Sequence, residues 1–351
     1  MSNEVLFFGG FMVFIILMLA IDLGLFSKSN KAVSLKQAAI MSGVWVSFAL
    51  IFYVVLRVWG DELHNIENFA QLVAVTEKHF HNITLIPGNF EESLAIYRNN
   101  LALEYITGYV VEYALSVDNI FVMVLVFSSF GVKPEYYHKV LVWGIIGAVV
   151  LRFIFIFIGA ALIAKFGWIL YVFGFFLVYT GIMMFVNRNN DDEIDPQNHT
   201  VVKFASKYFS VYPTFVDGKF FHIENGKKFI TPLFLVLLVI EFTDVIFAVD
   251  SIPAIFAVTK DPYIVFFSNI FAILGLRSMF FLLVNIIHKF HYLKVGLSLL
   301  LVFIGAKMLL HSWLAEWGFK TSHSLIIIIS ILALSVVASL MFPKKESVQE
   351  Q

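Results

Sequence analysis

Long apolar runs separated by short polar stretches dominate the pattern of this chain. Nine runs approach the length of about 20 residues that a membrane-spanning helix needs. They lie near residues 5–26, 35–58, 101–128, 138–162, 166–187, 230–258, 263–286, 290–312 and 323–342. The pattern therefore predicts an all-α membrane protein with about nine transmembrane helices. The first run lacks a basic start and a small-residue cleavage site, so we expect a retained helix and not a signal peptide.

Lysines orient the predicted helices. Lys28, Lys31 and Lys36 follow the first run, whereas no basic side chain precedes it. Because basic residues favour the cytoplasmic side, the N-terminus is expected outside and the C-terminus inside. The predicted parts are two N-terminal helices (1–58), an extracytoplasmic loop (59–100), a first three-helix unit (101–187), a cytoplasmic loop (188–229), a second three-helix unit (230–312), a last helix (323–342) and a cytoplasmic tail (343–351).

The third to fifth runs repeat as the sixth to eighth. The sequence SVDNI at 116–120 matches AVDSI at 248–252, and Gly181 matches Gly305. Each unit has an odd number of helices, so the two units must insert in opposite orientations. Such inverted repeats are typical of secondary transporters, whose site lies at the midplane between the units. Gene duplication without a transport role is the alternative interpretation.

The composition narrows the chemistry. Of 351 residues, 60% are hydrophobic and only 14% charged, whereas soluble domains have about 25% charged residues. A net charge of −1 gives no reason to expect a nucleic-acid partner. The absence of cysteine excludes disulfides, thiolate metal sites and cysteine nucleophiles. No phosphate-binding loop motif is present, so ATP drive within this chain is not expected.

Acids inside the apolar runs are the candidate functional residues. Each charge at mid-membrane costs roughly 2.5–3.5 kcal/mol, so their recurrence in both units calls for compensation. The candidate metal ligands are the acids and their neutral neighbours: Glu112, Asp118, Asn119, Glu241, Asp244, Asp250 and Ser251. Several carboxylates with amide and hydroxyl oxygens favour a hard divalent cation, such as Mn²⁺, Mg²⁺ or Ca²⁺.

The spacing of the acids requires two helices. Asp244 and Asp250 lie about 9 Å apart along a straight helix, so they cannot hold one ion by themselves. Pro253 is expected to kink this helix near Asp250 and to free backbone carbonyls as ligands. In an antiparallel partner helix, Glu112 would approach Asp250 and Asp118 would approach Asp244. A register that pairs Asp118 with Asp250 stays open.

Four more charges lie within the apolar runs. Arg152 and Arg277 fall at nearly equivalent depths of the two units and are supporting charges. Structural salt bridging of the acids by these arginines is the main alternative to ion binding. The acids outnumber these two cations, however, and protonation could neutralise the remainder. Asp22 and Lys307 are further intramembrane charges whose contact with the pathway is left open.

The polar segments carry weaker signals. His64, His79 and His81 fall in the outer loop, either as a metal-collecting set or as ordinary loop residues. The acidic run at 191–195 is another possible ion collector, although such runs are usually just solvated. Turn signals on either side of 220–224 predict a small β-hairpin on the cytoplasmic face.

Five long motifs carry a family resemblance. They are EYALSVDNIFV (112–122), GIIGAVVLRFIFIF (144–157), WILYVFGFFLVYTGIMM (168–184), EFTDVIFAVDSIPAIFAVT (241–259) and SNIFAILGLRSMFFLL (268–283). On these motifs the chain resembles the TerC family, most closely its Alx branch. The likeness covers nearly the whole chain, including MLAIDL at 18–23. It departs at 60–98, which is longer here than in the Alx pattern.

The resemblance implies a nine-helix protein of the bacterial inner (plasma) membrane, linked to manganese export. Within it, the motif acids Glu112, Asp118, Glu241, Asp244 and Asp250 are the proposed ion ligands. The family name comes from tellurium resistance, and some members have been called redox modulators. A chain without cysteine or an evident cofactor motif gives that redox label no support.

We therefore expect a secondary-active exporter and not an enzyme. Its cargo is expected to be Mn²⁺, with protons as the counter-ion, the lipid bilayer as its surroundings and no permanently bound cofactor. The alternative is a non-transporting membrane factor for envelope stress, tellurium resistance or membrane-protein insertion. A remote alternative is an intramembrane aspartyl protease, although the chain has no GxGD motif. The oligomeric state is left open.

Overall fold

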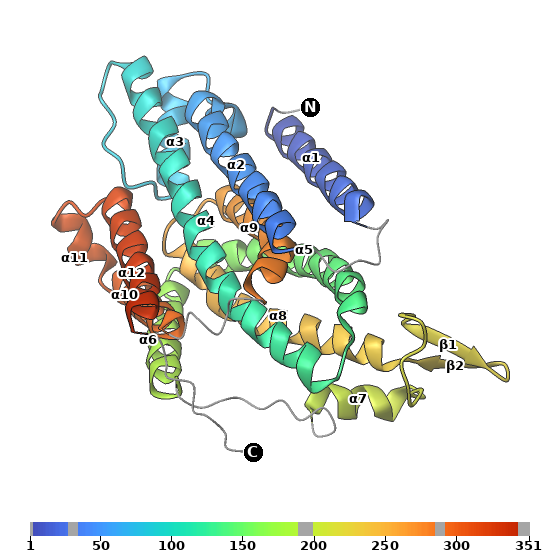
Figure 1. Ribbon diagram of the computed structural model, residues 1–351. Helices are drawn as coiled ribbons and strands as arrows, with labels where there is room; N and C mark the ends of the chain where they lie inside the picture. Colours follow the sequence, from blue (N-terminus) through green and yellow to red (C-terminus); the bar gives the residue numbers. More distant parts are fainter. Residues whose placement is uncertain (1–2, 27–33, 189–198, 285–291, 343–351) are drawn as a thin grey trace.

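The computed structural model describes residues 3–26, 34–188, 199–284 and 292–342 (Figure 1). Each of the nine apolar runs forms a helix. They are α1 (Asn3–Phe26), α2 (Leu35–Trp59), α4 (Phe90–Ser129), α5 (Pro134–Lys165), α6 (Ile169–Val186), α8 (Pro232–Phe256), α9 (Pro262–Leu283), α10 (Leu293–Leu309) and α12 (Thr321–Met341). The shorter elements are η1 (Glu62–His64), α3 (Phe69–Lys78), α7 (Thr200–Tyr208), β1 (Phe221–Glu224), β2 (Lys227–Ile230) and α11 (His311–Glu316).

Seven of the helices in the described ranges are long and apolar enough to cross a membrane: α2, α4, α5, α6, α8, α9 and α12. The apolar part of α1, Phe7–Ile21, and the 17-residue α10 are shorter. The protein is therefore a mostly helical, multi-pass membrane protein. The count of nine spans stays a prediction, because α1 and α10 are apolar but their apolar parts are shorter than those of the seven spanning helices.

Helix α4 begins earlier than the apolar pattern predicts. Asn89 caps it, accepting a hydrogen bond from the backbone N–H of Glu92 at 3.2 Å. Glu91 and Glu92 in the first turn also suit the positive end of the helix dipole. The predicted 59–100 loop is thus partly helical: η1, α3 and the first turns of α4 occupy it. Hydropathy missed this part because the α4 extension is charged.

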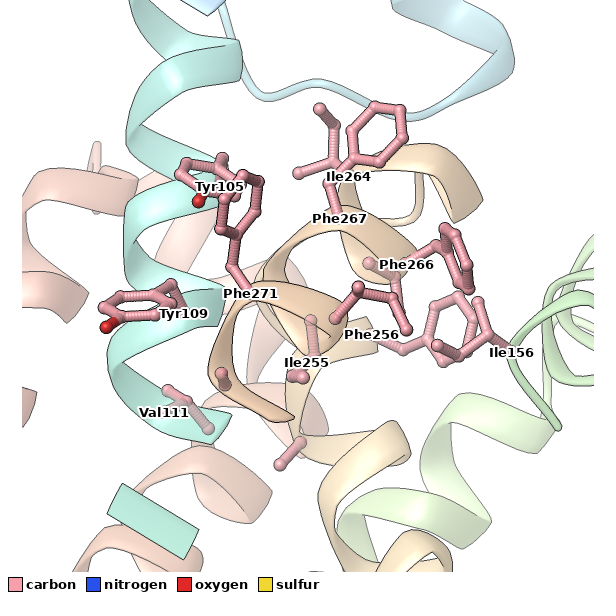
Figure 2. Packing of buried hydrophobic residues seen from close by; sticks show 14 of the residues in the cluster. Tyr105, Tyr109, Val111, Ile156, Ile255, Phe256, Ile264, Phe266, Phe267 and Phe271 are labelled. Atoms are coloured by element: carbon pink, nitrogen blue, oxygen red, sulfur yellow. The ribbon is translucent and has the colours of Figure 1, made fainter. Parts of the chain in front are cut away.

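Helix α9 lies at the centre of the bundle and contacts α2, α4 and α5. Nearly all of its span is buried, as expected for a helix that is apolar on every side. The tilted rings of Phe267 and Phe11 have centroids 4.3 Å apart, and the ring centroids of Phe271 and Phe52 are 5.0 Å apart. Figure 2 shows the same aromatic core next to Tyr105 of α4. This aromatic core holds α4 and α9 together.

Helices α6 and α10 touch backbone to backbone. A Cβ atom placed on Gly305 would lie 2.7 Å from the carbonyl oxygen of Gly174. One placed on Gly181 would lie 2.8 Å from the carbonyl oxygen of Ser298. Neither neighbour is a flexible side-chain end, so only glycine fits at these points. Small residues allow this close approach, which favours helix association where lipid supplies no hydrophobic driving force.

The predicted hairpin is confirmed. Strands β1 and β2 pair antiparallel, with Glu224 opposite Lys227. Asn225 and Gly226 form the two-residue turn, both with positive φ (50° and 75°), as the Asn-Gly signal requires. The hairpin lies beside α7 and the start of α8 (Figure 1). The acidic run at 191–195 lies outside the described residues.

Candidate functional site

The guanidinium of Arg152, on α5, is the centre of a buried polar cluster. Arg152 and Glu112 are each about 1% exposed and form an ion pair. The same Nη1 atom donates to the Ser251 hydroxyl at 2.9 Å and to the side-chain amide oxygen (Oδ1) of Asn269 at 2.6 Å. Its Nη2 atom lies 3.6 Å from Asp244. Three helices, α4, α8 and α9, thus supply polar side chains to one charge on a fourth helix, α5.

Helices α4 and α8 cross in a register that brings polar neighbours of the acids together. Asn119 donates a hydrogen bond to Asp244 at 3.4 Å, and Ser251 hydrogen-bonds Glu112. These contacts lie one residue away from the predicted pairs Glu112–Asp250 and Asp118–Asp244. The neutral ligands predicted beside the acids make the interhelical contacts, and Arg152 bridges Glu112 to Asp244 between the levels.

Asp250 belongs to a second group. It hydrogen-bonds Thr180 of α6, and its charge interacts with that of Asp118. Helix α8 continues through Asp250 and Pro253 and ends at Phe256, so the helix is unbroken where the kink is predicted. Pro253 nevertheless lacks an N–H, so the carbonyl four residues earlier has no helical donor.

Glu241 lies one turn below Asp244, and its carboxylate rests directly on Gly147 of α5. Any side chain at position 147 would occupy the place of this carboxylate. Two cavities of about 10 Å³ each border Asp244, one reaching Asn119 and the other reaching Glu241. Each has about the volume that a single water molecule needs. Asp244 thus stands between two small spaces whose walls are mostly apolar.

The predicted ligands do not converge on one point. Among the described residues, no three histidine or acidic side chains come together in a way that could hold a metal ion. Three buried carboxylate oxygens, Glu112 Oε2, Asp244 Oδ2 and Asp250 Oδ1, accept no hydrogen bond from the described part of the chain. Three carboxylate oxygens thus stay without a partner inside the bundle, and the predicted ligands are not assembled around one point.

The other predicted charges lie elsewhere. Arg277 lies 3.2 Å from His138 of α5. Lys307 lines a separate cavity near the α3 end of the bundle. Asp22 belongs to α1, but its side chain is outside the described part of the structure.

Sequence reasoning missed three contributors to these groups: Asn269, Thr180 and Gly147. A polar pair, Ser268–Asn269, inside an otherwise apolar run was the available signal for Asn269. Nothing in the local sequence distinguishes Thr180 or Gly147 from ordinary helix residues, because only their partners on α8 give them a role.

The sequence profile of the integral membrane protein TerC family matches residues 97–347. The chain belongs to the TerC family. A TerC relative from Myxococcus xanthus, named only as an uncharacterized membrane protein, is 44% identical over 94% of this chain and 91% of its own length.

Two further TerC relatives are named as candidate membrane-bound redox modulators, Alx. The one from Photorhabdus laumondii is 39% identical over 99% of this chain and 98% of its own length. The one from Escherichia coli K12 is 42% identical over 87% of this chain and 86% of its own length. These relatives agree with the Alx branch of TerC. No solved structure matches the chain.

Outside the spans, this TerC protein buries its loop histidines. His64 Nε2 lies 2.7 Å from Asp261, the N-cap of α9, and His81 Nδ1 lies 3.0 Å from Glu104 of α4. The His79 ring stands 4.8 Å from that of His64. His79 and His81 are each 6% exposed, so they are not ordinary solvated loop residues. The contacts of His64 and His81 therefore attach the 60–89 segment to α9 and α4.

Burial and charge shift the pKa values in this cluster. Burial lowers the pKa of His79 to about 4, although Asp261 acts against the shift. Burial would raise the pKa of Asp261, but His64 and its neighbouring histidines hold it well below its usual range. Burial also opposes a positive His81, yet Glu104 raises the pKa of that imidazole. The cluster therefore keeps Asp261 ionised and His79 neutral at pH 7.

Proposed function

We propose that this TerC protein is a secondary-active transporter that exports a hard divalent cation, with Mn²⁺ as the preferred cargo. One observation carries the proposal: Glu112 and Asp244, buried among four membrane helices, share one arginine and keep unpartnered oxygens. A purely structural ion pair would need only one acid to neutralise the one arginine. The surplus of buried negative charge suits a cation that comes and goes.

The donor chemistry supports a hard cation. Carboxylate, hydroxyl and amide oxygens surround the Arg152 position, and the whole chain contains no cysteine. Oxygen-only ligands favour Mn²⁺, Mg²⁺ or Ca²⁺ over softer metals. The choice of Mn²⁺ among these rests on the family resemblance and not on the donor set.

The arrangement also supports a competition mechanism. Arg152 already holds the place of a cation between Glu112 and Asp244. A divalent ion that arrives beside Asp244 from the Glu241 cavity would displace the guanidinium toward Asn269 and Ser251, which already accept from it. In this mechanism the acids assemble around the cation only when the arginine withdraws.

Pairwise contacts support the inverted repeat. The alignment that matches Glu112 with Asp244 also matches Asn119 with Ser251. Replacing each residue by its equivalent in the other unit therefore turns the contact Glu112–Ser251 into the contact Asp244–Asn119. A two-fold axis between α4 and α8 produces this exchange. We propose on this basis a 3+3 inverted repeat, with the site on its axis.

The α6–α10 contacts behave in the same way. The alignment of Gly181 with Gly305 places Gly174 on Ser298, and the two contacts are Gly174–Gly305 and Gly181–Ser298. The orientation proposed from the lysines, with the N-terminus outside and the C-terminus inside the bacterial inner membrane, then completes the topology.

Export requires a second ion. Moving a divalent cation outward against 100 mV costs about 4.6 kcal/mol, at about 2.3 kcal/mol per charge. Inward proton flow is the proposed source of this energy, because carboxylates that release a metal ion can accept protons. This exchange needs no bound cofactor.

The test is Mn²⁺ uptake into inside-out membrane vesicles that contain the full chain, driven by an acidic lumen. We expect uptake to be abolished in Asp244→Asn and Glu112→Gln and by a protonophore. Glu224→Gln, at the exposed hairpin turn, is the matched control and should transport normally. Competition by Mg²⁺ and Ca²⁺ ranks the cargo.

Transport by Asp244→Asn at the wild-type rate would refute the site. If the wild-type vesicles take up no more Mn²⁺ than empty ones, transport itself is wrong. A non-transporting stress or insertion factor would then be favoured if Asp244→Asn still complements a deletion strain. The redox name of the Alx relatives makes a different prediction, a change in membrane redox state with no dependence on Glu112 or Asp244.

A further inference from the structure

A second polar site lies away from the membrane acids. A cavity of about 260 Å³ opens near the α3 end of the bundle, where α6, α8, α10, α11 and α12 meet. Its polar wall includes Glu104, Thr259, Lys260, Lys307, His311 and Lys320. Ile163, Leu170, Phe256 and Met308 form much of the remainder. The volume approaches that of small-molecule sites, which begin at roughly 300 Å³.

The cavity carries surplus positive charge. Its one carboxylate, Glu104, already accepts hydrogen bonds from Thr259 at 2.6 Å and from Asn100 at 2.8 Å, and it pairs with His81. No ion pair of Lys260 or Lys307 occurs among the described residues. Glu104 also attracts Lys307, but three lysines of the wall face this one carboxylate.

The positions of the lysines make this surplus costly without a ligand. Lys260 lies over the Phe80 ring, with Nζ 4.3 Å from the centroid, and its burial lowers its pKa. Burial, together with Lys260 and Lys307, also lowers the pKa of His311. Lys307 stands in the last turn of α10. An anion in the cavity would relieve the repulsion among these groups.

Aromatic residues place the cavity mouth at a membrane surface. Trp168 adjoins the lining residue Gly167, and Trp313 adjoins the lining residue Leu314. Both indoles are exposed, as is Trp317 at 81%. Exposed tryptophans gather at the level of the lipid headgroups. The short helix α11 lies at this rim, next to α10 and α12 (Figure 1).

We propose that this cavity binds a phosphate-bearing anion at the membrane surface. Lys260, Lys307 and Lys320 would contact the phosphate, and the apolar wall would receive attached acyl chains. A glycerophospholipid headgroup and free phosphate share this chemistry, and the apolar wall favours the lipid. The site is independent of cation transport, since Glu112, Asp244 and Asp250 do not line it.

Native mass spectrometry of the delipidated full chain tests the proposal. The probes are phosphatidylglycerol, phosphatidylcholine and inorganic phosphate, each added separately to the protein in detergent. We expect tighter binding of phosphatidylglycerol than of phosphatidylcholine. Each of Lys260→Gln and Lys307→Gln should weaken it about fivefold, as expected for one lysine near an anionic surface. Lys227→Gln, on the exposed hairpin, is the matched control and should leave binding unchanged.

The outcomes separate the two sources. Binding of inorganic phosphate that the lysine variants weaken, without preference between the two lipids, supports the phosphate site with a soluble ligand. Lys307→Arg keeps the charge and should retain binding, which separates loss of contact from misfolding. Equal binding of phosphatidylglycerol by wild type, Lys260→Gln and Lys307→Gln, with no phosphate binding, would overturn the proposal.

Discussion

Removal of the Arg152 charge should expose how the membrane acids are balanced. Its Nη2 atom lies 3.6 Å from Asp244, a separation at which opposite charges attract by about 4.6 kcal/mol at an effective dielectric constant of 20. Glu112 is closer still. Arg152→Gln leaves both carboxylates buried, and such a loss typically costs about 3–5 kcal/mol.

Proton uptake limits that cost and makes it depend on pH. Protonating a glutamate of ordinary pKa costs about 3.7 kcal/mol at pH 7 but only about 1 kcal/mol at pH 5. The destabilisation by Arg152→Gln should therefore shrink as the pH falls. Adding Glu112→Gln to the same chain removes one uncompensated acid and should recover about 2 kcal/mol at pH 7.

Unfolding followed by tryptophan fluorescence in mixed micelles, at pH 7 and pH 5, measures these differences. Arg98→Gln is the matched control, because Arg98 pairs with Asp61 at 2.6 Å but is partly exposed. Exposed pairs contribute only about 0–1 kcal/mol. Strictly additive losses for Arg152→Gln and Glu112→Gln, or equal losses at both pH values, would refute the charge-balance reasoning.

Three further predictions concern the loop, the helix contact and the hairpin. His79 takes up a proton near pH 6.5 in the unfolded chain but only near pH 4 in the folded chain. Acidification to pH 5 should therefore lower the stability of the loop against unfolding by about 2 kcal/mol. Amide exchange in α3 should show this loss in the wild type but not in His79→Asn. Gly305→Ala forces a Cβ atom against the Gly174 carbonyl and should lower the thermal midpoint, whereas Gly43→Ala, with open space around it, should not. Gly226→Ala should destabilise the hairpin by about 1 kcal/mol, since alanine resists positive φ; amide exchange across β1 and β2 would reveal it, and unchanged protection would contradict it.

Most of the helical scaffold could be predicted from the sequence, because an apolar run long enough to span a membrane has few alternatives. The hairpin was equally accessible, since Asn225-Gly226 specifies its turn. The early start of α4 was not: its first turns are charged and form against the loop. Local composition cannot reveal a helix whose exposed end is polar.

The sequence indicated some members of the buried polar cluster but not its geometry. The acids inside the spans pointed to Glu112 and Asp244, which the structure places around Arg152. The bridging role of Arg152 and the contribution of Asn269 depend on how four helices rotate about their axes. No sequence period reports that rotation. The histidine cluster was missed as a buried unit because Asp261 lies almost 200 residues from His64.

The contact between α6 and α10 restricts how the acids can be reached. At Gly174 and Gly181 backbone lies against backbone, and the side chains of Val178, Val302 and Leu309 pack closely around these contacts. A movement that opens the space around Asp244 must therefore leave α6 and α10 travelling as one unit.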